Sequence, residues 1–163
     1  NKGGAQFWRI AAAMPRTKFL AVRGGYGEQV IPATVPGNVE LIPNTADMRG
    51  DVYARTRILL MPSEYESWGR VGVEAMCSGI PVIAHPSPGL RESLGDAGAI
   101  VDRDDTDGWV AAIRRLSTPR AWAAASRRAT ARAQQLDPTA DLDTFAAAMV
   151  DVAAAPRPRR RAS

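Results

Sequence analysis

Two glutamates, Glu66 and Glu74, stand eight positions apart in the stretch PSEYESWGRVGVEAMCSGIPVIA, residues 62–84. Between them lies Gly69, near which the residue pattern predicts the start of a helix. The free backbone amides of a helix start, expected here over residues 68–71, favour a bound anion such as a phosphate. A carboxylate would repel that phosphate, so the two glutamates are expected to bind hydroxyl groups on either side of it.

A nucleotide sugar fits this arrangement, because it carries hydroxyl groups on both sides of its diphosphate. Glu74 is expected about five residues into the helix, roughly 7 Å along its axis at about 1.5 Å per residue, while Glu66 stays in the loop. The ribose would then bind one glutamate and the hexose the other. The spacing alone is equally compatible with two ordinary surface or capping glutamates, which are common in the first turns of helices.

Beside the two glutamates, the sequence predicts no metal site and no nucleophilic residue. Glycine at position 69 is expected because a side chain there would crowd a ligand brought close to the backbone. A metal pair is not favoured, because no histidine or third carboxylate is suitably placed near the two glutamates. The only histidine, His85, follows a predicted strand and is interpreted as structural. The lone Cys77 cannot form an internal disulfide and is interpreted as a small buried residue rather than a nucleophile.

Short apolar runs alternate with helical patterns along most of the chain. Strands are predicted at residues 18–22, 39–42, 58–62, 80–84 and 98–102. Helices are predicted at residues 4–14, 47–56, 71–78, 88–95, 105–117, 119–136 and 139–155.

This alternation predicts an α/β fold, a Rossmann-like doubly wound parallel sheet with a helical C-terminal extension. In such a sheet, ligands bind where the carboxyl ends of the strands run into helix starts, which is where Glu66 is expected. We expect three parts: a sheet domain over residues 1–117, helices over 118–155 that pack on the sheet or towards another domain, and a disordered basic tail over 156–163. A domain of this type usually opens with a strand, and residues 1–3 offer none, so a first strand is expected to be missing.

The amino-acid composition argues against two classes of function, membrane-spanning proteins and nucleic-acid-binding domains. A chain of 163 residues fits one domain, and no apolar run approaches the length of a membrane helix. Without the four arginines of the tail, the 21 basic residues fall to 17, which equals the 17 acidic residues. The body is therefore neutral, and no nucleic-acid binding is expected. The chain is expected to be cytoplasmic, with the tail either solvated or in contact with an anionic membrane surface.

The stretch around the two glutamates resembles the C-terminal, donor-binding domain of retaining GT-B glycosyltransferases of family 4 (group 1), which carry an E-x7-E motif. Glu66 and Glu74 stand at the two glutamates of that motif. The surrounding matches are Lys2-Gly3, Pro62-Ser63, Glu74-Ala75-Met76, Gly79-Ile80-Pro81-Val82, Gly89-Leu90-Arg91-Glu92 and Gly98-Ala99-Ile100-Val101. The resemblance covers about residues 2–117 in register.

The resemblance implies one half of a GT-B enzyme that holds a nucleotide-sugar donor, with UDP- or GDP-sugars as the candidates. It implies Lys2 on the diphosphate, Glu66 as the catalytic residue on the sugar hydroxyls, and Glu74 on the ribose. Further donor residues that it implies are Gly69, Arg70 and Val71 for the diphosphate, Trp68 for the sugar or ribose, and Val22, Arg23, Ile42 and Pro43 for the base. No metal or other cofactor is expected, because Lys, Arg and the helix start would neutralise the leaving diphosphate.

The chain also departs from the family pattern. The acceptor-binding N-terminal half, with its own catalytic histidine, does not occur in these residues, Arg23 stands where glycine is common, and Arg70 replaces an aliphatic residue. A lone donor half should bind nucleotide weakly and transfer nothing, because both walls of the cleft are needed to exclude water and position the acceptor. The alternatives are a stand-alone nucleotide-binding or regulatory module completed by a partner chain, and another GT-B enzyme such as a nucleotide-sugar epimerase or a phosphorylase.

Overall fold

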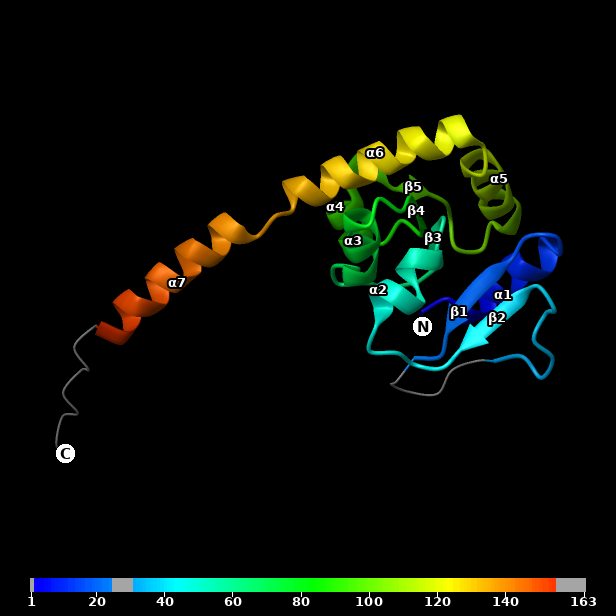
Figure 1. The fold of residues 1–163 in the computed structure, drawn as a ribbon, viewed down its shortest axis with the longest axis horizontal. Coiled ribbons are helices and arrows are strands. Elements are labelled where there is room, and N and C mark those ends of the chain that lie inside the picture. Colours follow the sequence, from blue (N-terminus) through cyan, green and yellow to red (C-terminus); the bar gives the residue numbers. More distant parts are fainter. Residues whose placement is uncertain (1, 25–30, 155–163) are drawn as a thin grey trace.

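The computed structural model describes residues 2–24 and 31–154 (Figure 1). The glycine-rich loop residues 25–28 and the basic tail 156–163 lie outside the described residues. The strands are β1 (Phe19–Val22), β2 (Val39–Ile42), β3 (Leu59–Met61), β4 (Val82–Ala84) and β5 (Ala99–Ile100). The helices are α1 (Gly4–Ala13), α2 (Met48–Asp51), α3 (Arg70–Cys77), α4 (Pro88–Leu94), α5 (Thr106–Leu116), α6 (Pro119–Gln135) and α7 (Thr139–Ala154), with single 3-10 turns η1 (Tyr53–Arg55) and η2 (Gly95–Ala97).

Every strand pairing in the described chain is parallel, and the α/β class expected from the sequence is confirmed. The strands form two groups, one with the order β1-β2 and the other with the order β3-β4-β5. The helix predicted at residues 47–56 is divided into α2 and η1 at Val52. Asp47 caps α2 by accepting a hydrogen bond from the Gly50 amide, so this helix starts where the sequence places it but ends after one turn.

Two hydrophobic clusters cover the two faces of the strands, as a doubly wound fold requires. On one face, Val82, Ala84 and Met61 pack with apolar residues of α3, α4 and η1. On the other face, Ile83 packs with residues of α1 and α5, including the fully buried Trp109. Because successive side chains of a strand point to opposite faces, β4 is buried on both sides and its sequence is continuously apolar.

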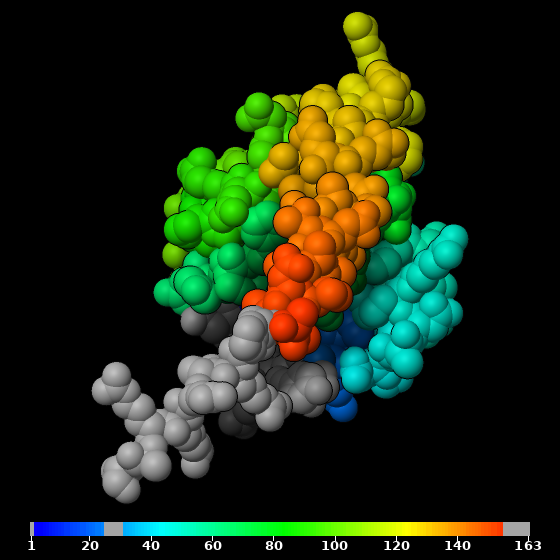
Figure 2. Space-filling model, turned by 90° about the vertical axis from the view of Figure 1, so that its left-hand side faces the viewer, coloured from blue at the N-terminus to red at the C-terminus, as the bar shows by residue number. Residues whose placement is uncertain are grey.

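The two C-terminal helices differ in how they meet the body. α6 lies along α3 and α5, and Trp122 on it donates its indole N–H to the Arg57 carbonyl at 2.8 Å. α7 runs away from the body (Figure 1), so that it lies in front of the body when viewed from that side (Figure 2), and none of its residues is buried. Its exposed large apolar side chains are Leu142, Phe145, Met149, Val150 and Val152. No helix in the described ranges combines the length and apolar character needed to cross a membrane.

Cys77 is a correction to the sequence analysis, because its side chain is exposed and not buried. The buried residues of α3 are Gly72, Ala75 and Met76. Cys77 follows Met76 by about 100° around the helix, which turns it to solvent.

Candidate functional site

The centre of the candidate site is the loop that leads from β3 into α3. The start of α1 lies directly against this loop: Gly3 has φ 77°, and a Cβ atom on it would lie 2.1 Å from the Pro62 carbonyl oxygen. Only glycine permits this conformation and this approach. The Ser63 hydroxyl also reaches the Lys2 carbonyl at 3.5 Å. Residues 2 and 3 are therefore held at the carboxyl end of β3.

Gly69 begins α3 in the same way that Gly3 begins α1. It has φ 73°, and a Cβ atom on it would lie 2.4 Å from Cδ2 of Leu90. The structure thus explains this glycine by its left-handed backbone and by the packing of Leu90, whereas the sequence analysis explained it by the approach of a ligand. Neither α1 nor α3 has a side-chain cap, so the first amides of both helices are available to an anion.

The carboxylates of the motif are paired with cations in the structure. Lys2 Nζ lies 2.7 Å from Glu66 Oε1, with side-chain exposures of 76% for Lys2 and 14% for Glu66. Arg70 Nε lies 3.1 Å from Glu74 Oε1. Arg70, expected on the diphosphate, is therefore directed along α3 to Glu74 in this state. Each glutamate has one basic neighbour that a bound anion could draw away.

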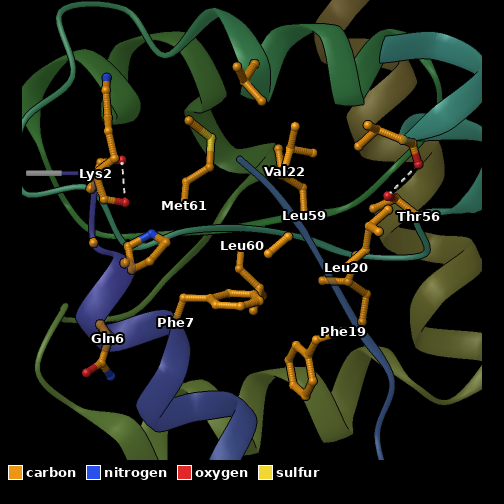
Figure 3. Close-up of a pocket in the computed structure, with 18 of the residues that line it drawn as sticks. Lys2, Gln6, Phe7, Phe19, Leu20, Val22, Thr56, Leu59, Leu60 and Met61 are labelled. Atoms are coloured by element: carbon orange, nitrogen blue, oxygen red, sulfur yellow. Dashed lines mark hydrogen bonds between the residues drawn. The ribbon is translucent and has the colours of Figure 1, made fainter. Parts of the chain in front are cut away.

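A cleft of about 1450 Å³ opens beside this loop (Figure 3). Predicted donor residues in its lining are Lys2, Val22, Glu66, Trp68, Gly69, Arg70 and Val71. The predicted residues Arg23, Ile42, Pro43 and Glu74 are not among those that line it. Arg23 and Ile42 are joined at the carboxyl ends of β1 and β2, where the Arg23 amide donates to the Ile42 carbonyl at 2.9 Å.

Sequence reasoning missed Tyr53, which positions Glu74. The Tyr53 hydroxyl donates to Glu74 Oε2 at 2.7 Å, and the residue is buried at 7% exposure. Burial, followed by the hydrogen bond to Glu74 and the charge of that carboxylate, raises the pKa of Tyr53 well above its ordinary value. The phenol therefore stays protonated and keeps donating to Glu74. The sequence offered only a general indication of this role, namely that a buried tyrosine hydroxyl needs a hydrogen-bond partner.

We expect Tyr53→Phe to loosen Glu74 without opening a cavity, because only the hydroxyl is removed. The loss of one hydrogen bond to a carboxylate should lower the free energy of unfolding by about 1–2 kcal/mol, measured by urea titration. Thr56→Val is the matched control, because it also removes a hydroxyl that donates nearby, to the Val52 carbonyl, but not to Glu74. If the proposal below is correct, only Tyr53→Phe should also weaken nucleotide binding, and equal effects of both variants on binding would contradict a positioning role.

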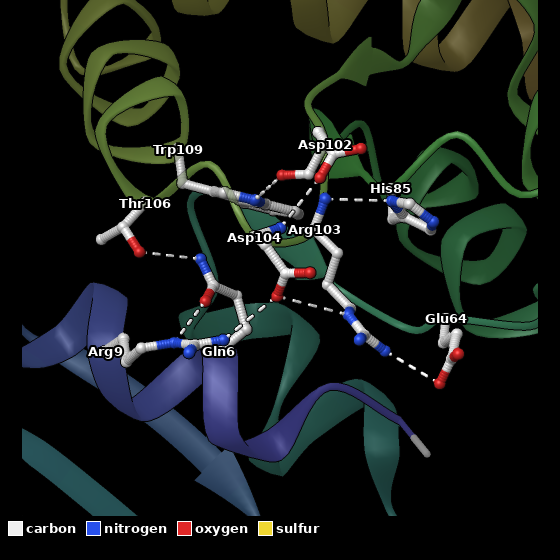
Figure 4. Close-up of polar contacts among 9 residues, drawn as sticks. All are labelled: Gln6, Arg9, Glu64, His85, Asp102, Arg103, Asp104, Thr106 and Trp109. Atoms are coloured by element: carbon white, nitrogen blue, oxygen red, sulfur yellow. Dashed lines mark hydrogen bonds and ion pairs between the residues drawn. The ribbon is translucent and has the colours of Figure 1, made fainter.

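A polar network holds the first turns of α1 against the loops after β3 and β5 (Figure 4). The buried Gln6 donates to the Thr106 hydroxyl at 3.1 Å and accepts from Arg9 at 2.7 Å. Arg9 also pairs with Asp104 at 3.2 Å. Arg103, next to Asp104, pairs with Glu64 at 2.9 Å and so joins this network to the loop that carries Glu66. The position of the Lys2 end of α1 is thus fixed from several sides.

His85 has a structural contact. Its Nδ1 accepts a hydrogen bond from the Arg103 amide at 3.0 Å, beside the network of Figure 4. Among the described residues, no group of three or more His, Cys, Asp or Glu side chains could hold a metal ion.

The sequence is similar to known glycosyltransferases. A family profile described as "Glycosyl transferases group 1" matches residues 6–118. The D-inositol 3-phosphate glycosyltransferase of Mycolicibacterium smegmatis is 34% identical over 173 aligned residues, which cover 95% of this chain and 40% of the relative. The enzyme of the same name from Rhodococcus opacus is 35% identical over 118 residues, which cover 68% of this chain and 26% of the relative. The chain thus spans less than half the length of these relatives.

Solved structures show the same fold. Sucrose-phosphate synthase from Thermosynechococcus elongatus matches with a TM-score of 0.77 at 24% identity, over 94% of this chain and 43% of that one. HepE from Anabaena, solved in complex with UDP-glucose, also gives a TM-score of 0.77, at 22% identity, over 93% of this chain and 45% of that one. The chain belongs to the group 1 glycosyltransferases, and its fold is that of the C-terminal half of a GT-B enzyme.

Proposed function

We propose that this chain is the donor-binding half of an enzyme that transfers a sugar, with retention, from a nucleoside-diphosphate sugar to an acceptor. The observation that carries the proposal is the meeting of two uncapped helix starts, those of α1 and α3, with Lys2 and Glu66 in one cleft. Two sets of free amides and an ammonium group suit a diphosphate, which a single helix start would hold less well. The complex of HepE with UDP-glucose supports a nucleotide sugar as the ligand class.

The ion pair between Lys2 and Glu66 suggests how the donor would be bound. Lys2 is largely exposed, so its pairing with Glu66 contributes little stability and can be exchanged. A diphosphate carries more charge than a carboxylate and would draw Lys2 to itself. Glu66, which is mostly buried, would then stay in place with a free carboxylate to accept hydrogen bonds from the sugar hydroxyls.

The same groups would serve the chemical step. When the bond from the sugar to the diphosphate breaks, negative charge grows on the leaving phosphate oxygens. Lys2, once drawn to the diphosphate, and the first amides of α1 and α3 would lie where that charge develops, so they would stabilise the transition state more than the bound substrate. Glu66, in contact with the sugar, would position it as the bond breaks.

The rest of the donor would extend over the carboxyl ends of the strands. Val22, Arg23, Ile42 and Pro43 follow β1 and β2 at that edge and are the proposed neighbours of the base. Glu74, held by Tyr53 and Arg70, would bind the ribose. Trp68 lines the cleft with 38% of its surface exposed and can pack against the sugar or the ribose.

A nucleotide panel tests the proposal. The chain is titrated with UDP, GDP, ADP and dTDP, with uridine and UMP as controls, and binding is followed by ligand-observed NMR, which detects millimolar affinity of about −4 kcal/mol. We expect one diphosphate to bind and uridine to show no binding. Equal binding of UDP and uridine would contradict a diphosphate site. Absence of binding by all four diphosphates, also after addition of an acceptor half, would reject the donor assignment.

A further inference from the structure

Arg103, which is not among the proposed donor contacts, joins the loops that follow three consecutive strands (Figure 4). Its Nη1 lies 2.9 Å from Oε2 of Glu64, in the loop between β3 and α3 that also carries Glu66. Its backbone amide donates to Nδ1 of His85, directly after β4, at 3.0 Å. Arg103 itself lies in the loop between β5 and α5. The loops at the carboxyl ends of β3, β4 and β5 are therefore tied together at this one residue.

The backbone around Arg103 is held in place from the side of α5. The fully buried Trp109 donates its indole N–H to the Asp102 carbonyl at 2.8 Å. The Asp104 amide donates to the Asp102 carboxylate at 3.0 Å, and the Asp105 side chain caps α5. A side chain can fix the position of another loop only if its own base is fixed by packing and hydrogen bonds. The Arg103 guanidinium meets this condition.

Two carboxylates share the Arg103 guanidinium. Its Nη1 pairs with Glu64, and its Nε lies 3.7 Å from Oδ1 of Asp104. The Arg103 side chain is 30% exposed, against 57% for Glu64 and 65% for Asp104. Ion pairs this exposed contribute little to the free energy of unfolding, so their effect is expected on the position of the loop. Because two carboxylates already neutralise Arg103, it is a poor candidate for a further cation on the diphosphate.

The contact with Glu64 matters most when the donor is bound. In the described chain, two ion pairs hold the loop over residues 62–69: Lys2 with Glu66, and Arg103 with Glu64. Under the proposed function, the diphosphate draws Lys2 away and so removes the first of these pairs. The second pair remains, and Glu64 is at most about 7 Å from Glu66 along the chain. The loop would then depend on Arg103.

We propose that Arg103 is a positioning residue for the donor sugar: through Glu64, it keeps Glu66 at the sugar hydroxyls after Lys2 has moved to the diphosphate. The inference rests on the proposed function. A displacement of Glu66 by about 1 Å would weaken its contacts with the sugar, whereas the diphosphate contacts come from other elements. Arg103 also lines the cleft, so the experiment must separate an action through Glu64 from direct contact with the ligand.

Backbone mobility tests the role of Arg103 without any ligand. NMR relaxation of the backbone amides is measured in the Lys2→Ala chain, which mimics the release of Lys2, with and without Arg103→Gln. We expect the order parameters of Tyr65 and Glu66 to be about 0.85 in Lys2→Ala and to fall below about 0.6 when Arg103→Gln is added. Arg120→Gln is the matched control, because it removes the same charge from an exposed position on α6.

Ligand binding then separates positioning from direct contact. Kd values are measured for the diphosphate that the nucleotide panel selects and for the nucleotide sugar of that base that binds best, with UDP and UDP-glucose among the candidates. Arg103→Gln should leave the Kd of the free diphosphate within about twofold and raise that of the nucleotide sugar about fivefold to tenfold. Glu64→Gln and the double variant should give the same rise, because Arg103 acts through Glu64. Arg103→Lys, whose ammonium group can pair with Glu64, should restore most of the affinity.

Three results would overturn the proposal. The first is a set of order parameters that Arg103→Gln leaves unchanged in the Lys2→Ala chain. The second is a loss of nucleotide-sugar affinity in Arg103→Gln but not in Glu64→Gln, because Arg103 would then contact the ligand itself. The third is an equal rise in Kd for the free diphosphate and the nucleotide sugar, which would indicate a general disturbance of the site. Absence of nucleotide binding to the unmodified chain would reject the proposed function and with it the role at the sugar, while the order parameters would still show whether Arg103 holds the loop.

Discussion

Gly89→Ala is expected to displace the loop that carries Glu66 and to destabilise the whole fold. A Cβ atom at position 89 would lie 2.3 Å from the Glu66 carbonyl oxygen and 2.4 Å from that of Ser67. Both neighbours are backbone atoms, so the contact can be relieved only if α4 or the site loop moves. Such overpacking typically costs about 1–3 kcal/mol, and each kcal/mol lowers Tm by about 2–4 °C in a chain of this size.

The measurement is thermal unfolding followed by circular dichroism, with Gly37→Ala as the control. A Cβ atom at position 37 would meet nothing within 4 Å, so that variant should keep the wild-type Tm or exceed it slightly. Gly89→Ala should also weaken nucleotide binding below its own Tm, because a shift of about 1 Å in Glu66 would spoil the site. Equal Tm values for the two variants would show that α4 does not support the loop.

The fold followed from the sequence where hydrophobic pattern alone decides local structure. Residues 80–84 were predicted as a strand because they form a short apolar run, and the structure places β4 there, buried on both faces. The division of residues 47–56 into α2 and η1 was missed, because it accompanies the turning of Tyr53 into the core. Tertiary contacts of this kind leave no periodic signal.

The site was only partly accessible from the sequence, for a similar reason. The E-x7-E motif identified Glu66 and Glu74 as site residues, and the family resemblance identified Lys2. The pairing of Lys2 with Glu66 joins residues 64 positions apart and depends on how α1 meets the end of β3. Tyr53 was missed because its role depends on one hydrogen bond across the fold. Predicted roles for the base-binding residues Arg23 and Pro43 stay predictions.

The strongest test of the donor site measures the contributions of Lys2 and Glu66 to ligand binding separately. If Lys2 binds the diphosphate, Lys2→Ala removes a charge-assisted contact worth about 1.5–3 kcal/mol, so the Kd for the diphosphate that the panel selects, written here as UDP, should rise by about 10- to 100-fold. Arg120→Ala is the matched control, because it removes one positive charge from an exposed position on α6 and leaves the cleft intact. A similar rise in Kd for both variants would mean that UDP binding depends only on the net charge of the protein.

Glu66→Gln should act in the opposite direction on UDP. The variant removes the carboxylate that competes for Lys2 and that repels the incoming diphosphate, so UDP should bind as tightly as to the wild type or more tightly. The corresponding nucleotide sugar (UDP-glucose if the panel selects UDP and the sugar is glucose) should lose its advantage over the free diphosphate, because the neutral amide accepts hydrogen bonds from sugar hydroxyls less strongly than a carboxylate. The ratio of the two Kd values is therefore the measurement. If the Kd values of both ligands rise by the same factor, Glu66 contacts the diphosphate and has no role at the sugar. If both ligands bind more tightly and the ratio of their Kd values is unchanged, Glu66 acts only as the counterion of Lys2.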